Sequence, residues 1–169
     1  AGRGVLRPLV SVLTVLLPDH LDRYPGMDAY VEDKKAIFRE QEPDQHAVLN
    51  RDDPRQAGFA DETRARVSWY SAAPLPGGVD GAWLADGEGR LRATPGTPAH
   101  TLLAGTRLAG THNRMNLLAA GLALARYGVK PEVIARSLGE FTGVEHRLEL
   151  FHEAGGVRYV DDSTATMPH

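Results

Sequence analysis

Two asparagines three residues apart, Asn113 and Asn116, open an apolar stretch of helix-forming residues that runs to Tyr127. A spacing of three places both side chains on one face of a helix. The first turn of a helix has free backbone N–H groups and the positive end of the dipole, which favour a polar or anionic ligand. Asn113 is also an ordinary N-cap residue type. Taken alone, it is explained more simply as a cap than as a binding residue.

A histidine between carboxylates lies in the polar loop that follows the first apolar segment. His20 comes directly after Asp19 and shortly before Asp22. A neutral imidazole can bind a divalent cation, and neighbouring carboxylates can orient its ring. A solvated loop histidine explains the same residues, and this motif alone favours that simpler interpretation.

A lysine falls on the face of an expected helix that should turn inward. Lys34 lies four residues after Tyr30, so the two side chains stack on one face. A buried ammonium is costly unless it is paired or chemically altered. A lysine can also extend its amine to solvent along an apolar surface, and the spacing leaves both interpretations open.

The C-terminal part holds two further groups of charged and polar side chains. Arg147 lies between apolar positions of an expected strand, and its planar, permanent charge suits a phosphate or a nucleobase. An ion pair with Glu145 or Glu149 explains it equally well.

Residues 159–166 end an expected strand with two carboxylates and three hydroxyls, which suit ribose hydroxyls, metal-bound waters or a substrate amine. An ordinary Asx turn is the alternative there.

A mostly parallel α/β framework is expected to position these side chains. Residues 9–17 are apolar and rich in β-branched types, which predicts a buried parallel strand, and residues 46–50 predict a second short buried strand. Asp28 is expected to cap a helix over residues 29–41. Ligands bind at the carboxyl ends of strands in such sheets, where the His20 loop also lies.

The second half of the chain changes in character twice. Residues 55–111 contain short apolar segments broken by Pro-Gly and Asp-Gly, which predicts a small antiparallel layer attached to the main sheet. Helices are expected over residues 113–127 and from Pro131 to about residue 140. After a hinge at residues 141–143, strands over 147–153 and 157–161 predict a hairpin that opens a second domain.

Composition restricts the classes of partner. The chain has 169 residues, 42% hydrophobic and 24% charged, with a net charge of −3 and no cysteine. No basic field indicates nucleic acid or an anionic membrane as a partner. The absence of cysteine excludes disulfides and thiolate metal sites, and it fits a cytoplasmic protein. The apolar run at residues 8–18 is too short to span a bilayer and lacks the layout of a signal peptide.

The order and spacing of the motifs resemble the Mur ligase superfamily over nearly the whole chain. The shared segments are PDHLDRY (18–24), YVEDK (30–34), VLNRDD (48–53), GTHNRMNLLAA (110–120), FTGVEHRLE (141–149) and VDDSTAT (160–166). The resemblance implies an α/β fold with a mostly parallel sheet and flanking helices. Residues 1–142 would form the later part of a P-loop-type central domain with the small antiparallel layer. Residues 143–169 would form the first hairpin of a Rossmann-like C-terminal domain.

The resemblance also implies an activity. Members of this superfamily are cytoplasmic ligases of peptidoglycan synthesis that use ATP and Mg²⁺, and DDS-x-AT is typical of the branch that adds D-glutamate. In that branch ATP phosphorylates the carboxylate of UDP-N-acetylmuramoyl-L-alanine. The amine of D-glutamate attacks the acyl phosphate, and an amide forms, while magnesium offsets the charge on the phosphates. A monomer with no nucleic-acid or membrane partner is expected.

Three residues take catalytic roles by this resemblance. His20 matches the histidine ligand of the second magnesium ion. Lys34, rather than Lys35, matches a carbamylated lysine, because it lies four residues after the motif tyrosine. A carbamate would be an anion able to hold magnesium, which would explain an inward-facing lysine. His146 is expected near the reacting groups.

Six further residues take binding roles by the same resemblance. Those expected to contact ATP are Asn113, Asn116, Arg147 and Asp162. Those expected near the D-glutamate site are Ser163 and Thr166.

Three positions depart from the commonest pattern of the superfamily. Val15 and Met167 stand where asparagines are usual, and Thr164 stands where lysine is common. The change at Thr164 is the most consequential, because it removes a charge close to the phosphate.

The chain contains no G-x-x-x-x-G-K-[ST] segment, so the backbone nest and lysine that hold phosphates are missing. We therefore expect a fragment of a longer ligase that does not catalyse by itself. The alternatives are a sister Mur ligase or folylpolyglutamate synthase with another substrate, or a non-catalytic scaffold.

Overall fold

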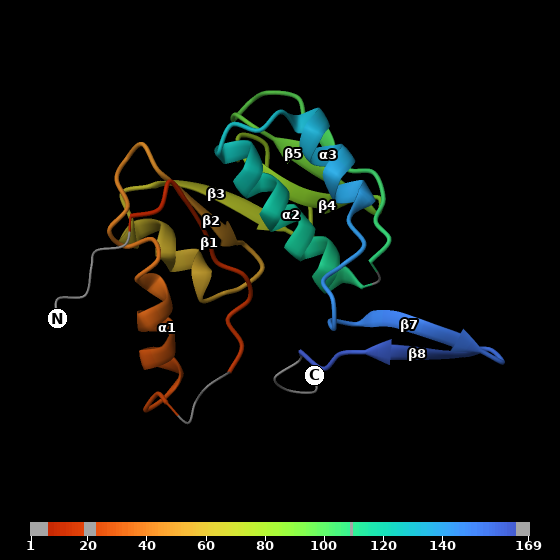
Figure 1. Cartoon of the computed structure of the whole chain (residues 1–169). Helices are drawn as coiled ribbons and strands as arrows, with labels where there is room; N and C mark the ends of the chain where they lie inside the picture. Colours follow the sequence, from red (N-terminus) through yellow and green to blue (C-terminus); the bar gives the residue numbers. More distant parts are fainter. Residues whose placement is uncertain (1–6, 19–22, 109, 165–169) are drawn as a thin grey trace.

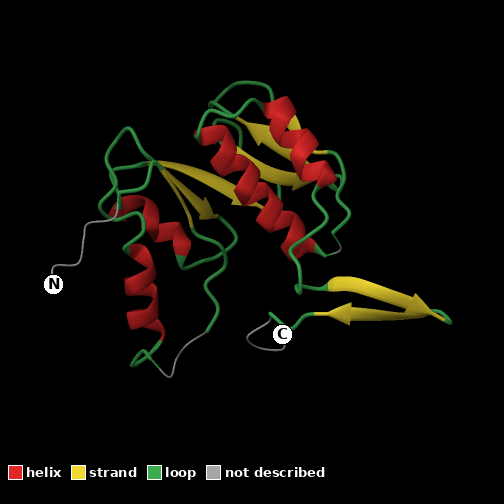
Figure 2. Ribbon diagram, viewed as in Figure 1, coloured by secondary structure: helices red, strands yellow, loops and turns green. Residues whose placement is uncertain are grey.

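A six-stranded sheet forms the centre of the computed structural model, which describes residues 7–18, 23–108 and 110–164 (Figures 1 and 2). The strands follow chain order across the sheet: β1 (Val10–Val12), β2 (His46–Asn50), β3 (Arg66–Ser71), β4 (Gly81–Ala85), β5 (Glu88–Arg92) and β6 (His100–Leu103). Strands β1 to β4 pair in parallel, and β4, β5 and β6 pair antiparallel. The predicted α/β class with a mostly parallel sheet is confirmed.

Helices cover the two faces of the parallel part of the sheet. They are α1 (Met27–Lys35), the 3₁₀ helix η1 (Gln56–Glu62), α2 (Thr111–Arg126) and α3 (Pro131–Glu140). Val48 packs in the cluster formed with α2 and α3, whereas its neighbours Ala47 and Leu49 pack in the cluster formed with α1 and η1. Because side chains alternate along a strand, β2 is buried on both faces, as its apolar sequence predicted.

Helix α2 lies close against the sheet and carries the two asparagines. A side chain at Gly121 would come within 2.9 Å of the Leu102 and Leu138 side chains, so glycine permits this close packing. The N-cap is Gly110, with φ of 91°. Asn113 is therefore a residue of the helix itself and not its cap.

The first strand is shorter than predicted. Residues 9–17 were expected to be one strand, but β1 ends at Val12. Beyond it, the Leu13 carbonyl accepts from the Tyr70 hydroxyl at 3.1 Å, and the Leu16 N–H donates to Asp53 Oδ2 at 3.1 Å. The segment leaves the sheet because side chains satisfy its backbone groups.

Helix α1 also differs from the prediction of residues 29–41 with Asp28 as cap. Its N-cap is Gly26, Asp28 lies in the first turn, and the α-helix ends at Lys35. The next three residues bond in the tighter 3₁₀ manner, ending with Phe38 N–H donating to the Lys35 carbonyl at 3.1 Å. Phe38 is fully buried, and the centre of its ring lies 5.6 Å from the centre of the Phe59 ring.

The antiparallel layer is not a separate appendage. Within residues 55–111, β3 pairs in parallel with β2, and β4 pairs in parallel with β3. Only β5 and β6 add antiparallel strands, and they extend the same sheet. The turn signals predicted these short strands, but the pairing partner of β3 depends on contacts distant in sequence.

Strands β7 (Glu149–Ala154) and β8 (Val157–Asp161) form a separate two-stranded sheet that extends away from the six-stranded one (Figure 1). Gly155 and Gly156, with φ of 58° and 77°, make the tight turn. The hairpin is thus as predicted, but β7 begins at Glu149, so Arg147 lies in the preceding turn and not in a strand. The division into domains at residues 142 and 143 stays a prediction.

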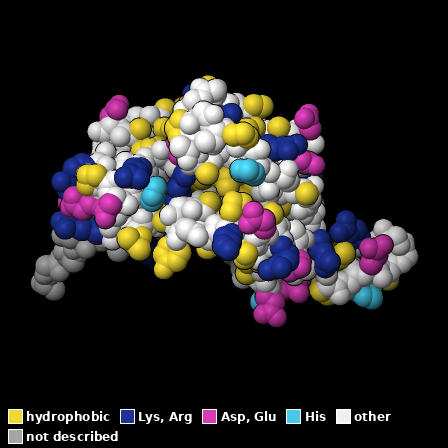
Figure 3. All heavy atoms as spheres, turned by 90° about the horizontal axis from the view of Figure 1, so that it is seen from above, with side chains coloured by type: hydrophobic (Ala, Val, Ile, Leu, Met, Phe, Trp, Pro, Cys, Tyr) yellow, Lys and Arg dark blue, Asp and Glu magenta, His cyan; other side chains and the backbone are white. Residues whose placement is uncertain are grey.

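The surface carries charges of both signs. On the face seen in Figure 3, basic and acidic side chains are interspersed with apolar ones. Among the described residues, no helix combines the length and the apolarity that crossing a membrane requires.

Candidate functional site

A pocket of about 710 Å³ lies between helix α2 and the segment that leads into β7. Asn113 and Asn116 line it from the helix, and Arg147 lines it from the turn before β7. These three predicted nucleotide contacts are thus brought together from two segments about thirty residues apart. The shared helical face expected from their spacing is confirmed.

The other walls of the pocket are apolar at the helix and charged at the rim. Leu117 and Ala120 follow the asparagines on the same face of α2, each four residues further on. Phe141 adds a ring from the segment after α3. Arg107 and Arg158, which the sequence analysis did not select, line the pocket as well. Glu145 and Glu149 add carboxylates to the lining. The apolar wall and the amides suit a planar heterocycle, and the guanidinium groups suit an anionic group attached to it.

The turn that presents Arg147 has an unusual backbone. His146 and Leu148, on either side of it, have φ of 61° and 48°. Residues other than glycine rarely adopt this left-handed conformation, which costs of order 1 kcal/mol or more per residue. The Arg147 N–H donates to the Val144 carbonyl at 3.2 Å and closes the turn. Such a backbone persists where surrounding contacts hold it.

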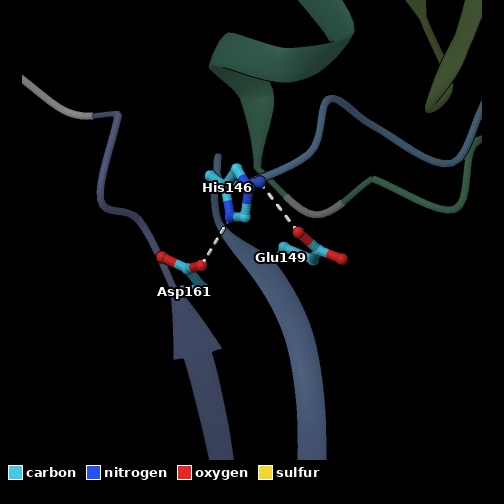
Figure 4. A group of neighbouring side chains, drawn as sticks. All are labelled: His146, Glu149 and Asp161. Carbon is cyan, nitrogen blue, oxygen red and sulfur yellow. Dashed lines mark hydrogen bonds and ion pairs between the residues drawn. The ribbon is translucent and has the colours of Figure 1, made fainter.

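His146 is fixed by two carboxylates (Figure 4). Its Nδ1 lies 2.8 Å from Asp161 Oδ2, and its backbone N–H donates to Glu149 Oε2 at 2.8 Å. The hydrogen bond and the charge of Asp161 raise the pKa of His146. In return, the hydrogen bond to His146, together with hydrogen bonds from Ser163, lowers the pKa of Asp161 to about 2.

These three residues place one possible ligand atom each within 4.8 Å of one another. Both carboxylates already accept hydrogen bonds, and His146 is exposed. We therefore assign no metal to this cluster.

The loop after β8 contacts the Arg147 turn directly. Asp162 Oδ1 accepts from the Leu148 N–H at 3.1 Å, and the Ser163 N–H donates to Asp161 Oδ1 at 2.9 Å. Neither His146 nor Asp162 is among the described residues that line the pocket. Their expected roles at the reacting groups and at ATP stay predictions.

The expectation that Lys34 faces inward is wrong. Lys34 is exposed, and its Nζ lies 5.1 Å from the centre of the Tyr30 ring. The buried lysine is Lys35, whose Nζ donates to Glu32 and Glu62 at 2.8 Å each. Two carboxylates from α1 and η1 thus pair the buried ammonium.

Two predicted site residues, His20 and Thr166, lie outside the described residues, as does Met167. Ser163 is exposed in the loop after β8, and Val15 is exposed in the coil after β1.

A second pocket, of about 350 Å³, lies at the carboxyl ends of the parallel strands. Its walls include Asn50 at the end of β2, Asp52 and Asp53 after it, and His112 at the start of α2. No role was predicted for Asp52 or Asp53 from the sequence. Their place directly after a buried parallel strand was the available signal.

Asp52 and Asp53 also hold neighbouring loops together. The two carboxylate oxygens of Asp52 accept from the Ser71 hydroxyl at 2.8 Å and from the Ala72 N–H at 2.6 Å. Asp53 is buried and accepts from the Leu16 N–H.

Comparison with known proteins gives the family. The sequence pattern of the Mur ligase middle domain matches residues 2–124. A UDP-N-acetylmuramoylalanine–D-glutamate ligase from Symbiobacterium thermophilum is 40% identical over 161 residues, covering 95% of this chain and 35% of the relative. A ligase of the same name from Roseiflexus sp. is 37% identical over 173 residues, covering 99% of this chain and 37% of the relative. The chain thus spans about a third of the length of these relatives.

Solved structures agree on the fold. A MurF from Acinetobacter baumannii superposes with a TM-score of 0.73 at 20% identity, covering 92% of this chain and 34% of that one. The MurF ligase from Thermotoga maritima in complex with ADP gives a TM-score of 0.62 at 21% identity, covering 92% and 35%. At this identity the likeness supports the fold alone. The match of the middle-domain pattern over residues 2–124 shows that this chain belongs to the Mur ligase family.

Proposed function

We propose that this chain forms part of an ATP-dependent ligase that joins D-glutamate to UDP-N-acetylmuramoyl-L-alanine in peptidoglycan precursor synthesis. The observation that carries the proposal is the pocket in which Asn113, Asn116 and Arg147 meet. The names of the relatives from Symbiobacterium thermophilum and Roseiflexus sp. support D-glutamate as the added amino acid.

Different residues of the pocket would contact different parts of a nucleotide. Asn113 and Asn116 offer amide donors and acceptors to a base edge, and Leu117 gives the base an apolar wall. Arg147 offers a fork of N–H donors to a phosphate. ATP, when bound, would supply the phosphoryl group that converts a carboxylate into an acyl phosphate, from which the attacking amine displaces inorganic phosphate as the amide forms. His146 belongs to the same turn, and the nearby Asp161 carboxylate raises its pKa.

Magnesium is proposed as the cofactor, with His20 and a carbamylated Lys34 as ligands. The described residues do not form such a site as they stand, because Lys34 is an exposed ammonium above the Tyr30 ring. An ammonium cannot ligate a cation, so this role requires the carbamate. Ser163 and Thr166 are proposed near the D-glutamate site.

Phosphate release from ATP tests the proposal. The full-length polypeptide that contains these residues is incubated with ATP, Mg²⁺ and UDP-N-acetylmuramoyl-L-alanine. D-glutamate is present, absent, or replaced by L-lysine or meso-diaminopimelate. We expect phosphate release only with D-glutamate, because the phosphate leaves the acyl phosphate when the amine of the added amino acid displaces it. Lys34→Ala is expected to abolish release.

Lys130→Ala is the matched control, because Lys130 is an exposed lysine at the start of α3 that does not line the pocket. It should leave release unchanged. Release with another amino acid would indicate a sister ligase, and no release with any of them would indicate a scaffold. Either outcome contradicts the proposal.

A further inference from the structure

The end of β8 and the loop after it are attached to the turn that presents Arg147 by four hydrogen bonds. In two of them a carboxylate takes part: Asp161 Oδ2 lies 2.8 Å from His146 Nδ1, and Asp162 Oδ1 accepts from the Leu148 N–H. The other two come from Thr164 and end on one atom, the carbonyl oxygen of His146. The Thr164 backbone N–H lies 3.1 Å from this oxygen, and the Thr164 hydroxyl lies 2.8 Å from it.

The turn needs such contacts. His146 and Leu148 have left-handed backbones on either side of Arg147, which few residues other than glycine adopt. Rotation of the peptide after His146 would release this conformation and redirect the Arg147 side chain. The carbonyl that Thr164 binds belongs to that peptide, so the Thr164 hydroxyl opposes the rotation.

We propose that Thr164 is a positioning residue for the nucleotide, acting through its hydroxyl on the turn that directs Arg147 into the pocket. The proposal rests on the proposed function, since it takes Arg147 as a nucleotide contact. A lysine at this position would add a positive charge, whereas the Thr164 hydroxyl is neutral. The hydroxyl fixes the backbone of the turn, because it donates its hydrogen bond to the His146 carbonyl.

Two substitutions of Thr164 in the full-length enzyme test this inference first. Thr164→Val removes the hydroxyl and keeps the size of the side chain and the backbone N–H. We expect its KM for ATP to rise roughly five- to tenfold, the size of one lost hydrogen bond. kcat should change little, because a contact made equally in ground state and transition state affects KM. Thr164→Ser keeps the hydroxyl and should restore the KM.

Thr97→Val is the matched control. The Thr97 hydroxyl also donates to a backbone carbonyl, that of Thr94 at 2.7 Å, but in the loop between β5 and β6. It should leave the KM for ATP unchanged. If Thr164 only stabilised the hairpin, Thr164→Val would lower the melting temperature and leave the KM as it is, which would overturn the inference.

Combining Thr164→Val with Arg147→Ala shows whether Thr164 acts through Arg147. Once Arg147 is removed, losing the hydroxyl should raise the KM for ATP no further. Additive effects would overturn the inference. If the unaltered enzyme releases phosphate but Arg147→Ala leaves the KM unchanged, the nucleotide site itself is wrong. If Arg147→Ala raises the KM and Thr164→Val does not, only the role of Thr164 fails.

Discussion

His146 and Asp161 stabilise each other's charged forms. The pKa of His146 is raised from its usual 6.5, so the stability it contributes is complete below that value and is lost as the pH rises through the raised pKa. The pKa of Asp161 is lowered to about 2, so its contribution is present above the usual carboxyl range and is lost as the pH falls towards 2. The pair is therefore fully formed between roughly pH 4 and 6.5.

Asp161→Asn removes the charge that holds this pair. We expect the titration midpoint of His146, followed by NMR, to fall towards 6.5 in the variant. Glu153→Gln is the control, because Glu153 is a carboxylate of the same hairpin that lies 4.0 Å from Arg158 instead. The control should leave the midpoint where it is. An unchanged midpoint in Asp161→Asn would show that Asp161 does not hold the charge of His146.

Helical spacing alone did not identify which of the two adjacent lysines, Lys34 and Lys35, is buried. Spacing from Tyr30 placed Lys34 on the inward face, but Lys35 is the buried one. Burial lowers the pKa of Lys35, and its hydrogen bonds to Glu32 and Glu62 outweigh this and raise it overall. Glu62 lies 27 residues away in the chain, on η1, so no local pattern could have identified it.

At the level of the element, the end of α2 is attached to the sheet by one arginine. Arg126 donates to the Ser68 hydroxyl at 2.7 Å, to the Ala93 carbonyl at 2.7 Å, and to Asp80 Oδ2. Its side chain is 10% exposed and that of Asp80 is 26% exposed. The same helix presents Asn113 and Asn116 to the pocket at its other end, so this attachment fixes the direction of the helix.

Asp80→Ala leaves the Arg126 guanidinium largely buried without its carboxylate. We expect a loss of about 2 kcal/mol in the free energy of unfolding, reduced from the fully buried case because Asp80 is partly exposed. The free energy is measured by urea denaturation of the chain. Glu88→Ala is the control, because the Arg90–Glu88 ion pair that it removes is more exposed than the Arg126–Asp80 pair. It should lower the free energy of unfolding by less than about 1 kcal/mol. If both variants lost the same free energy of unfolding, the Arg126–Asp80 pair would stabilise the chain no more than the exposed Arg90–Glu88 pair does.

At the level of the whole molecule, the described residues supply only part of the nucleotide site that we propose. The pocket offers groups for a base and one phosphate, but the sequence has no Walker-type loop to hold a triphosphate. The relatives are about three times as long as this chain.

We therefore predict that the 169-residue chain alone forms no amide from ATP, D-glutamate and UDP-N-acetylmuramoyl-L-alanine. Amide product is measured by chromatography, with the full-length polypeptide as the positive control. Amide formed by the isolated chain would contradict the prediction.

The sequence by itself determined the family, the class of fold and most of the elements. The short apolar segment at residues 47–49 predicted β2, Pro131 marked the start of α3, and Gly155-Gly156 marked the hairpin turn, because these signals act within a few residues. The spacing of Asn113 and Asn116 likewise set their shared face. Helix geometry is local and follows from the chain alone.

Only the tertiary structure decided the features that depend on distant contacts. β1 ends at Val12 because Tyr70 and Asp53 bind the backbone beyond it, and β3 joins the parallel sheet because β2 pairs with it. Arg147 reaches the pocket because the loop at Thr164 holds its turn. Each of these depends on hydrogen bonds between segments that the sequence separates, and their partners become known only when the chain is folded.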